Sequence, residues 1–270
     1  MSAALDAIPA LLAPDEPPAC KVYNPQGAAP LLIVADHASN RIPRALDGLG
    51  IDPAYLDTHI AVDMGSAAVA RRLADRLDAT LVQAGYSRLV IDLNRGLTDP
   101  TGVPEVSDGV PVPGNCDLTA AQRQQRVHEI FLPYRRTIDA QLHRIRATGV
   151  VPAFIAIHSF TPIMANQRRP WQVGVLWDKD PRLPVPLLRR LREHADGLTV
   201  GDNEPYSGRH PADYTVDHHA EAAGLPHVSI EVRQDLLHTS ADCLHWADLL
   251  HDAFEPILAD PNLYTLWQGH

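Results

Sequence analysis

Two histidines each stand at the end of an apolar run that predicts a β-strand. His37 follows the run 31–36, and His158 follows the run 153–157. Imidazole nitrogens, with carboxylate or amide oxygens, are ligands of Zn²⁺, and a catalytic zinc keeps one position for water beside three protein ligands. In a chain with 14 histidines, either residue alone is better explained as a hydrogen-bonded side chain. The pair, at two strand ends, predicts a zinc site.

The third ligand of this site has two candidates. Asn40 lies three residues after His37 and brings an amide oxygen. Asp63 ends the segment His59-Ile-Ala-Val-Asp63 and brings a carboxylate. A negative carboxylate attracts a dication more strongly than an amide does, which favours Asp63. Asn40 stays open as the alternative.

Glu231 lies near the end of a third apolar run, residues 227–232. A carboxylate in such a strand costs free energy unless it has a partner or a chemical task. The task would be general acid–base catalysis, in which Glu231 takes a proton from water and returns it to the leaving group. The alternative is a structural ion pair with Arg233, which shares the same strand face.

Two arginines bracket the run 88–93, which we predict to be a further strand. Arg88 opens the run, and Asn94 and Arg95 follow it. A guanidinium binds a carboxylate through two parallel hydrogen bonds, and it can also stabilise an oxyanion. The alternative is a surface ion pair, which is the usual environment of an arginine.

Other motifs give weaker signals. The segment His218-His219-Ala-Glu221 has a spacing that could bind a metal from one helical face, and an exposed polar helix turn explains it equally well. The chain contains no HExxH, GxSxG, Walker A or GxGxxG motif. Ser39 and Ser159 therefore lack the context of a catalytic serine, and no nucleotide cofactor is indicated.

Apolar runs alternate with helical patterns from residue 30 onward, which predicts an α/β fold. The predicted strands are 31–36, 80–84, 88–93, 153–157, 172–177 and 227–232. The predicted helices are 66–77, a long helix capped by Thr119 with a kink at Pro133, 186–195 and 241–258. Because the carboxyl ends of parallel strands meet at one edge of a sheet, this fold would gather the candidate residues there.

The chain divides into a Pro/Ala-rich lead-in over residues 1–28, expected partly disordered or laid over the surface, and a single α/β domain over 29–270. Two segments, 96–117 and 201–217, are dense in Gly, Pro and Asp and lack periodicity. Long loops of this kind in compact domains usually carry function. We expect them to border the site.

Composition limits the function classes. The net charge of −10 argues against a nucleic-acid partner, while a few arginines in a cleft still allow an acidic substrate. Three distant cysteines predict free thiols and a cytoplasmic location. No signal peptide or membrane span is expected. The oligomeric state cannot be inferred from these features.

The chain resembles the N-formylglutamate amidohydrolase family. The matching stretches, in the family's order, are LLIVADHASNRIP (31–43), HIAVDMGSAAVARRLADRL (59–77), YSRLVIDLNRGLTDP (86–100), AIHSFTP (156–162), VGVLWD (173–178), GDNEPYSG (201–208) and YTVDHHAEAAGLPHVSIEVRQDLL (214–237). More distantly it resembles the aspartoacylase group, in which DLNR also occurs.

The resemblance implies a zinc-carboxypeptidase-like fold, a three-layer α/β/α arrangement with a mixed, mostly parallel central sheet. It implies that Asn94 and Arg95 hold a substrate carboxylate and that Arg88 polarises the scissile carbonyl. We count Ser159 and Arg233 with the substrate-binding residues. The wider superfamily has HxxE for its first two metal ligands, whereas this chain has His37-Ala-Ser-Asn40. That difference implies either weaker metal binding or a role for Asp63.

The resulting hypothesis is a zinc-dependent amidohydrolase that cleaves N-formyl-L-glutamate, or a similar N-acyl amino acid, to formate and L-glutamate in histidine breakdown. The first alternative is a metal-dependent peptidase or deacylase acting on N-acyl or cell-wall peptides. The second is a non-catalytic binding protein with a degenerate metal site.

Overall fold

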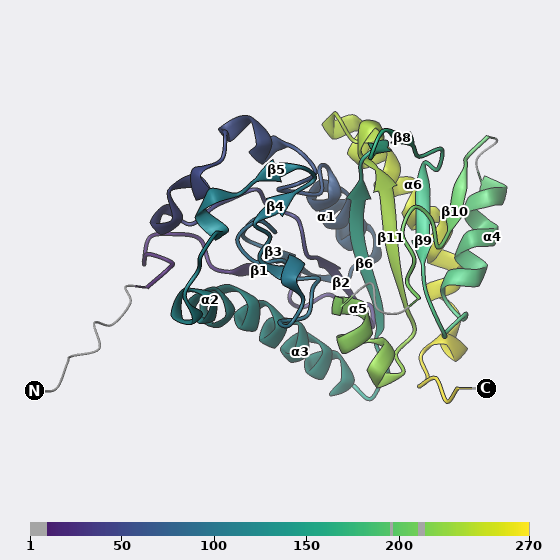
Figure 1. The fold of residues 1–270 in the computed structure, drawn as a ribbon. Helices are drawn as coiled ribbons and strands as arrows, with labels where there is room; N and C mark the ends of the chain where they lie inside the picture. The colour runs from purple at the N-terminus through teal and green to yellow at the C-terminus, as the bar shows by residue number, and fades with distance from the viewer. Residues whose placement is uncertain (1–9, 195–196, 210–213, 270) are drawn as a thin grey trace, which may run out of the picture.

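The computed structural model describes residues 10–194, 197–209 and 214–269, and a seven-stranded sheet forms its centre (Figure 1). The strand order is β1-β3-β2-β6-β11-β9-β10. The strands are β1 (Cys20–Tyr23), β2 (Leu31–Ala35), β3 (Thr80–Ala84), β6 (Ala153–Phe160), β9 (Val173–Leu176), β10 (Val200–Asp202) and β11 (His227–Arg233). Neighbours β3, β2, β6 and β11 are parallel, while β1 and the pair β9–β10 run antiparallel to them.

Helices cover both faces of the sheet, as predicted. Helices α1 (Ser66–Leu77), α4 (Pro184–His194) and α6 (Ser240–Leu258) lie on one face. Helices α3 (Leu132–Arg146), preceded by α2 (Ala120–Arg126), and α5 (Tyr214–His219) lie on the other. Alternation along β2 divides its side chains between two cores: Leu31 and Ile33 pack with the first layer, and Leu32 and Val34 with the second.

Shorter elements connect these layers. Two hairpins pair β4 (Val106–Ser107) with β5 (Val110–Pro111) and β7 (Ile163–Met164) with β8 (Gln167–Arg168). The 3₁₀ segments are Arg44–Gly50, Pro53–Asp57, Pro100–Gly102, Pro113–Asn115, Glu221–Ala223, Gln234–Leu236 and Pro261–Leu263. No helix in the described part of the chain is both long and apolar enough to cross a membrane.

The predicted strand at 88–93 is wrong. These residues form turns, although Leu89, Val90, Ile91 and Leu93 are buried. Their backbone groups are satisfied locally or by other loops: Val90 N–H donates to Ser87 O, and Asp92 N–H donates to Gly102 O. An apolar run reports burial, and burial alone does not separate a strand from a packed turn.

The N-terminal segment also differs from expectation. Residues 20–23, predicted within the surface lead-in, form strand β1 at the sheet edge beside β3. Leu11 is buried, and its N–H donates to Glu129 Oε1. A strand of four residues beside a Pro-rich stretch has too short a pattern to be distinguished from a loop.

The long helix predicted after Thr119 is continuous but not uniform. Thr119 caps α2 with a capping box, as predicted. A π-helical turn over Val127–Phe131 then separates α2 from α3, and Pro133 lies in the first turn of α3. A π turn is a common form of irregularity within a helix.

The two predicted loops are more structured than their composition indicates. Segment 96–117 contains the β4–β5 hairpin, and segment 201–217 contains parts of β10 and α5. Residues 210–213 of the second segment lie outside the described part of the chain.

Packing of α5 against α3 predicts an acid-sensitive stability. His219 is 4% exposed, and burial, with the nearby charge of Arg135, lowers its pKa from 6.5 to about 4. The folded state therefore binds this proton less tightly than the unfolded state does. The contribution of neutral His219 to the free energy of unfolding is complete above pH 6.5 and is lost as the pH falls towards 4. It amounts to roughly 3 kcal/mol.

Denaturant unfolding of His219→Gln at a series of pH values tests this. The variant should lack most of the stability loss between pH 6.5 and 4. His238→Gln, at an exposed position outside α5, is the control and should retain the loss. An unchanged pH profile in His219→Gln would contradict the prediction.

Candidate metal centre

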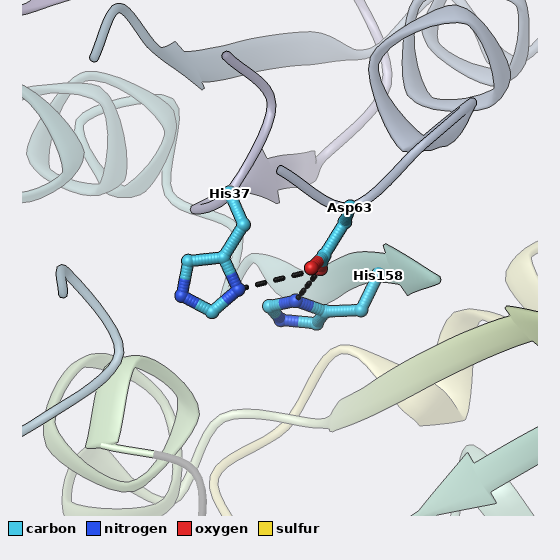
Figure 2. Close-up of side chains that lie close together, drawn as sticks. All are labelled: His37, Asp63 and His158. Atoms are coloured by element: carbon cyan, nitrogen blue, oxygen red, sulfur yellow. Dashed lines mark hydrogen bonds and ion pairs between the residues drawn. The ribbon is translucent and has the colours of Figure 1, made fainter. Parts of the chain in front are cut away.

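Three buried side chains, His37, Asp63 and His158, converge at the carboxyl edge of the sheet (Figure 2). Their candidate ligand atoms all lie within 4.8 Å of one another. His158 Nδ1 is 2.9 Å from Asp63 Oδ2, and His37 Nδ1 is 3.3 Å from the same oxygen. Two imidazole nitrogens and a carboxylate oxygen form a donor set that fits a divalent metal ion.

Neighbouring strands position the two histidines. His37 comes two residues after the end of β2, and His158 lies within β6, the next strand in the sheet. We expected β6 to end before His158, and it continues to Phe160.

Asp63 is placed by the turn that precedes α1. Its N–H donates to His37 O at 2.9 Å, which ties this turn to the segment after β2. Gly65 follows with φ +79°, and a Cβ there would lie 2.5 Å from Leu237 Cβ. Only glycine fits that position, because both the backbone conformation and the space exclude a side chain.

The electrostatics keep these groups charged while no metal is bound. Burial would lower the pKa of His158, but the hydrogen bond and charge of Asp63, with smaller effects of Glu231 and Asp36, raise it to about 10. Burial would likewise raise the pKa of Asp63, but the two imidazoles hold it well below 3.8. A metal ion would replace this proton as the partner of the carboxylate.

The candidate group lies in a polar cavity of about 670 Å³. Besides His37, Asp63 and His158, its lining includes Arg88, Asn94, Arg95, Ser159 and Glu231. The structure thus brings eight of the ten predicted site residues together. Asn40 and Arg233 are not among the lining residues.

Arg88 connects the candidate metal group to Asp92, which lies four residues further along the chain. Its guanidinium donates to Asp92 Oδ2 through Nη2 at 2.6 Å and Nε at 3.1 Å. Its Nη1 is 3.7 Å from Asp63 Oδ1. Although 88–93 is not a strand, the tight turn brings Arg88 into the cavity as that prediction required.

Asn94 and Arg95 also line the cavity. Asn94 Oδ1 accepts a hydrogen bond from Thr215 N at 2.9 Å, which fixes the orientation of the side-chain amide. Arg95 Nη1 donates to Asn94 O at 3.0 Å. Ser159 is also a buried lining residue, and its hydroxyl donates to Met64 O.

Glu231 faces the cavity from β11, and its register partner on β6 is His158. It is 7% exposed. Arg233, the alternative ion-pair partner, instead donates to Asp235 Oδ1 at 2.7 Å and to three backbone carbonyls. Arg233 therefore holds the loop before β9 in place, and it does not reach the cavity as a substrate-binding residue.

Two candidates for metal binding lie elsewhere. Asn40 donates through Nδ2 to Asp57 Oδ1 at 2.8 Å and borders a different surface hollow. Glu221 accepts a hydrogen bond from Lys179 at 2.7 Å, and His218 is exposed. Among the residues that the structure describes, the HxxE spacing at 218–221 thus forms no group of metal ligands.

Two carboxylates that were not among the predicted site residues lie behind the histidines. Asp92 Oδ1 lies 2.7 Å from His37 Nε2, and Asp36 Oδ2 lies 3.5 Å from His158 Nε2. Each is close in the chain to a residue that was singled out, but nothing in the pattern distinguishes them from loop-capping aspartates.

Substitutions at Asp63 and at Asn40 should differ in their effect on zinc affinity. Because Asp63 lies among the histidines and Asn40 does not, Asp63→Asn should weaken zinc affinity by at least 10–100-fold, the effect typical even of outer-shell partners. Asn40→Ala should leave the affinity nearly unchanged. Competition with a chromophoric chelator measures both, and the reverse order would make Asn40 the ligand.

Fold and site together define a three-layer α/β/α protein with a candidate metal centre in a polar cavity at the carboxyl edge of its sheet. The chain belongs to the N-formylglutamate amidohydrolase family, whose model matches residues 29–238.

Individual relatives agree with this assignment. A curated N-formylglutamate deformylase of Pseudomonas aeruginosa is 32% identical over 139 residues, which cover 45% of this chain and 48% of the relative. The match thus spans about half of that protein's length.

Two crystal structures share the fold. A gene product of Agrobacterium tumefaciens superimposes with a TM-score of 0.88 at 34% identity, over 92% of this chain and 98% of that one. An N-formylglutamate amidohydrolase from Ralstonia eutropha gives a TM-score of 0.62 at 22% identity, over 91% and 97% of the two chains. At that identity, the second likeness supports the fold alone.

Proposed function

We propose that this protein is a zinc-dependent amidohydrolase that cleaves N-formyl-L-glutamate, or a similar N-acyl amino acid, to formate and the free amino acid. The observation that carries the proposal is one cavity containing the His37–Asp63–His158 group and Glu231. Family membership supports the class of substrate.

The residues divide the chemistry among them. His37, Asp63 and His158 would hold the metal ion, which would lower the pKa of a bound water towards 7 and polarise the scissile carbonyl. Glu231 takes a proton from the attacking water and delivers it to the nitrogen of the leaving amine. Arg88 donates hydrogen bonds to the developing oxyanion.

Three further residues of the cavity lining orient the substrate. Asn94 has its Oδ1 engaged by Thr215, so its amide hydrogens are the donors available to a substrate carboxylate. Arg95 adds a planar guanidinium that pairs with the same carboxylate. Ser159 borders the cavity beside His158 and contributes to the substrate-binding surface.

The volume of the cavity is compatible with a second function. A formyl group needs almost no acyl pocket, whereas about 670 Å³ lies within the roughly 300–1,000 Å³ range of pockets for larger ligands. A deacylase or peptidase acting on longer N-acyl groups or peptides uses the same centre. The degenerate binding protein loses support, because Asp63 supplies the carboxylate that Asn40 does not.

Amine release from a panel of N-formyl, N-acetyl and N-succinyl amino acids separates the first two functions. The zinc-loaded protein should prefer N-formyl acidic substrates. Higher kcat/KM for longer acyl groups would favour the deacylase, and no turnover of any amide by a zinc-loaded, folded protein would refute both.

Arg95→Lys tests the carboxylate-binding role. Lysine keeps the positive charge but loses the planar pair of donors, so KM for an acidic substrate should rise roughly 10-fold, about the worth of one charged hydrogen bond, with kcat little changed. Steady-state kinetics on N-formylglutamate measure this. Arg233→Lys, outside the cavity, is the matched control, and an unchanged KM in Arg95→Lys would remove Arg95 from the carboxylate site.

A further inference from the structure

Asp36 lies behind the candidate metal centre, on the side of His158 that faces away from Asp63. Its Oδ2 is 3.5 Å from His158 Nε2, whereas the opposite ring nitrogen, Nδ1, is 2.9 Å from Asp63. Asp36 is fully buried. Because burial of a carboxylate is costly, its presence beside an imidazole requires a reason beyond packing.

Tyr134 holds the other oxygen of this carboxylate. Its hydroxyl, also fully buried, donates to Asp36 Oδ1 at 2.6 Å. Burial and the neighbouring charge of Asp36 raise the pKa of Tyr134 well above 10, so the phenol remains a donor. A short hydrogen bond from a hydroxyl to a carboxylate is among the stronger hydrogen bonds in proteins.

The helix that carries Tyr134, α3, is preceded directly by a π-helical turn. The π-helical turn Val127–Phe131 ends immediately before α3. One extra residue in a turn rotates the following helix by on the order of 100°, and such turns are frequent at functional sites. The π turn therefore helps to decide that Tyr134 faces Asp36. The next residue, Arg135, adds a buried positive charge whose electrostatic interaction with Asp36 offsets part of the carboxylate's charge.

We propose that Tyr134 and Asp36 are positioning residues of the metal centre. The negative charge of Asp36, 3.5 Å from Nε2 of His158, favours the tautomer that carries its hydrogen on Nε2 and turns the Nδ1 lone pair towards the metal ion, and Tyr134 fixes Asp36. Carboxylates orient metal-binding histidines in this way in many proteins. His37 has its own counterpart, since Asp92 lies 2.7 Å from its Nε2. This inference rests on the proposed metal site.

Zinc affinity, measured by chelator competition, tests the proposal independently of activity. Tyr134→Phe keeps the ring and loses only the hydroxyl, and we expect roughly 10-fold weaker zinc binding. Asp36→Asn should weaken it by 10–100-fold. Tyr86→Phe is the matched control, because Tyr86 is 1% exposed and its hydroxyl donates to Pro17 O, away from the centre. It should bind zinc like the wild type.

Proton NMR of the zinc-loaded protein supplies a second measurement. The wild type should show two exchange-protected imidazole Nε2–H signals, one from His37 and one from His158. Tyr134→Phe should shift the His158 signal and leave the other in place.

The outcomes separate this inference from the proposed function. Wild-type zinc affinity and an unshifted signal in Tyr134→Phe overturn the inference alone. Equal losses of affinity in Tyr134→Phe and Tyr86→Phe also overturn it, because they indicate general destabilisation. A folded wild-type protein that binds no zinc overturns the proposed function, and the inference with it. If Asp36→Asn does not fold, Tyr134→Phe and its control still decide the outcome.

Discussion

Replacing His158 by alanine should abolish tight metal binding and reduce amide hydrolysis to background. The substitution removes one of the two proposed imidazole ligands and leaves Asp63 without its 2.9 Å partner. Losing one member of a buried pair costs roughly 3–5 kcal/mol, so the metal-free variant should also unfold at lower denaturant concentration. Zinc content after loading and desalting, with circular dichroism to establish folding, measures both effects. A chelator should produce the same loss of activity in the wild type, and added zinc should restore it.

Two further variants separate loss of the ligand from loss of the fold. His158→Gln keeps a hydrogen-bond donor towards Asp63 but is a poor ligand, so it should fold and still lack tight zinc binding. His59→Ala removes a histidine from the cavity rim, where it pairs with Asp108 at 2.9 Å, and should retain zinc. Full zinc occupancy in both His158→Gln and His37→Gln would disprove the centre as assigned.

The fold could be predicted where the periodicity of the sequence was long enough. The runs that became β2, β3, β6 and β11 are continuous and apolar because both faces of these strands are covered. The run 88–93 has the same composition but packs as a turn, since its neighbours supply hydrogen bonds that a strand would otherwise provide. Sequence patterns report burial reliably and hydrogen-bond partners poorly.

In the candidate site too, the sequence pattern identified residues at strand ends but did not decide among residues placed by turns. His37 and His158 were identifiable because each lies at or near the end of an apolar strand. The position of Asp63 depends on the path of the turn before α1, which includes a glycine at positive φ and a hydrogen bond back to His37. That path brings Asp63, not Asn40, to the histidines. Which histidine each of Asp36 and Asp92 approaches could be determined only once the imidazole nitrogens had been located.

Glu231→Gln should lower kcat by roughly 10²–10⁴, the usual contribution of general acid–base catalysis, and leave zinc affinity nearly unchanged. Glutamine has almost the shape of glutamate but cannot accept a proton from water at neutral pH. Glu231 is 7% exposed, lines the cavity, and lies opposite His158 in the sheet, so it is placed to act on a water beside the proposed metal ligands. Its expected effect falls on kcat, whereas that of Arg95→Lys falls on KM, so the two variants assign different roles within one cavity.

The control for Glu231→Gln is the same substitution at a glutamate that has no proposed catalytic role. Glu221 provides it, because its carboxylate accepts a hydrogen bond from Lys179 at 2.7 Å and does not line the cavity. Glu221→Gln should retain the wild-type kcat. If Glu231 were only a structural partner, Glu231→Gln would lose stability while each folded, zinc-loaded molecule kept its turnover. Near-normal kcat in that folded, zinc-loaded variant would therefore exclude Glu231 as the base, because a variant that had lost its general base could not keep its turnover.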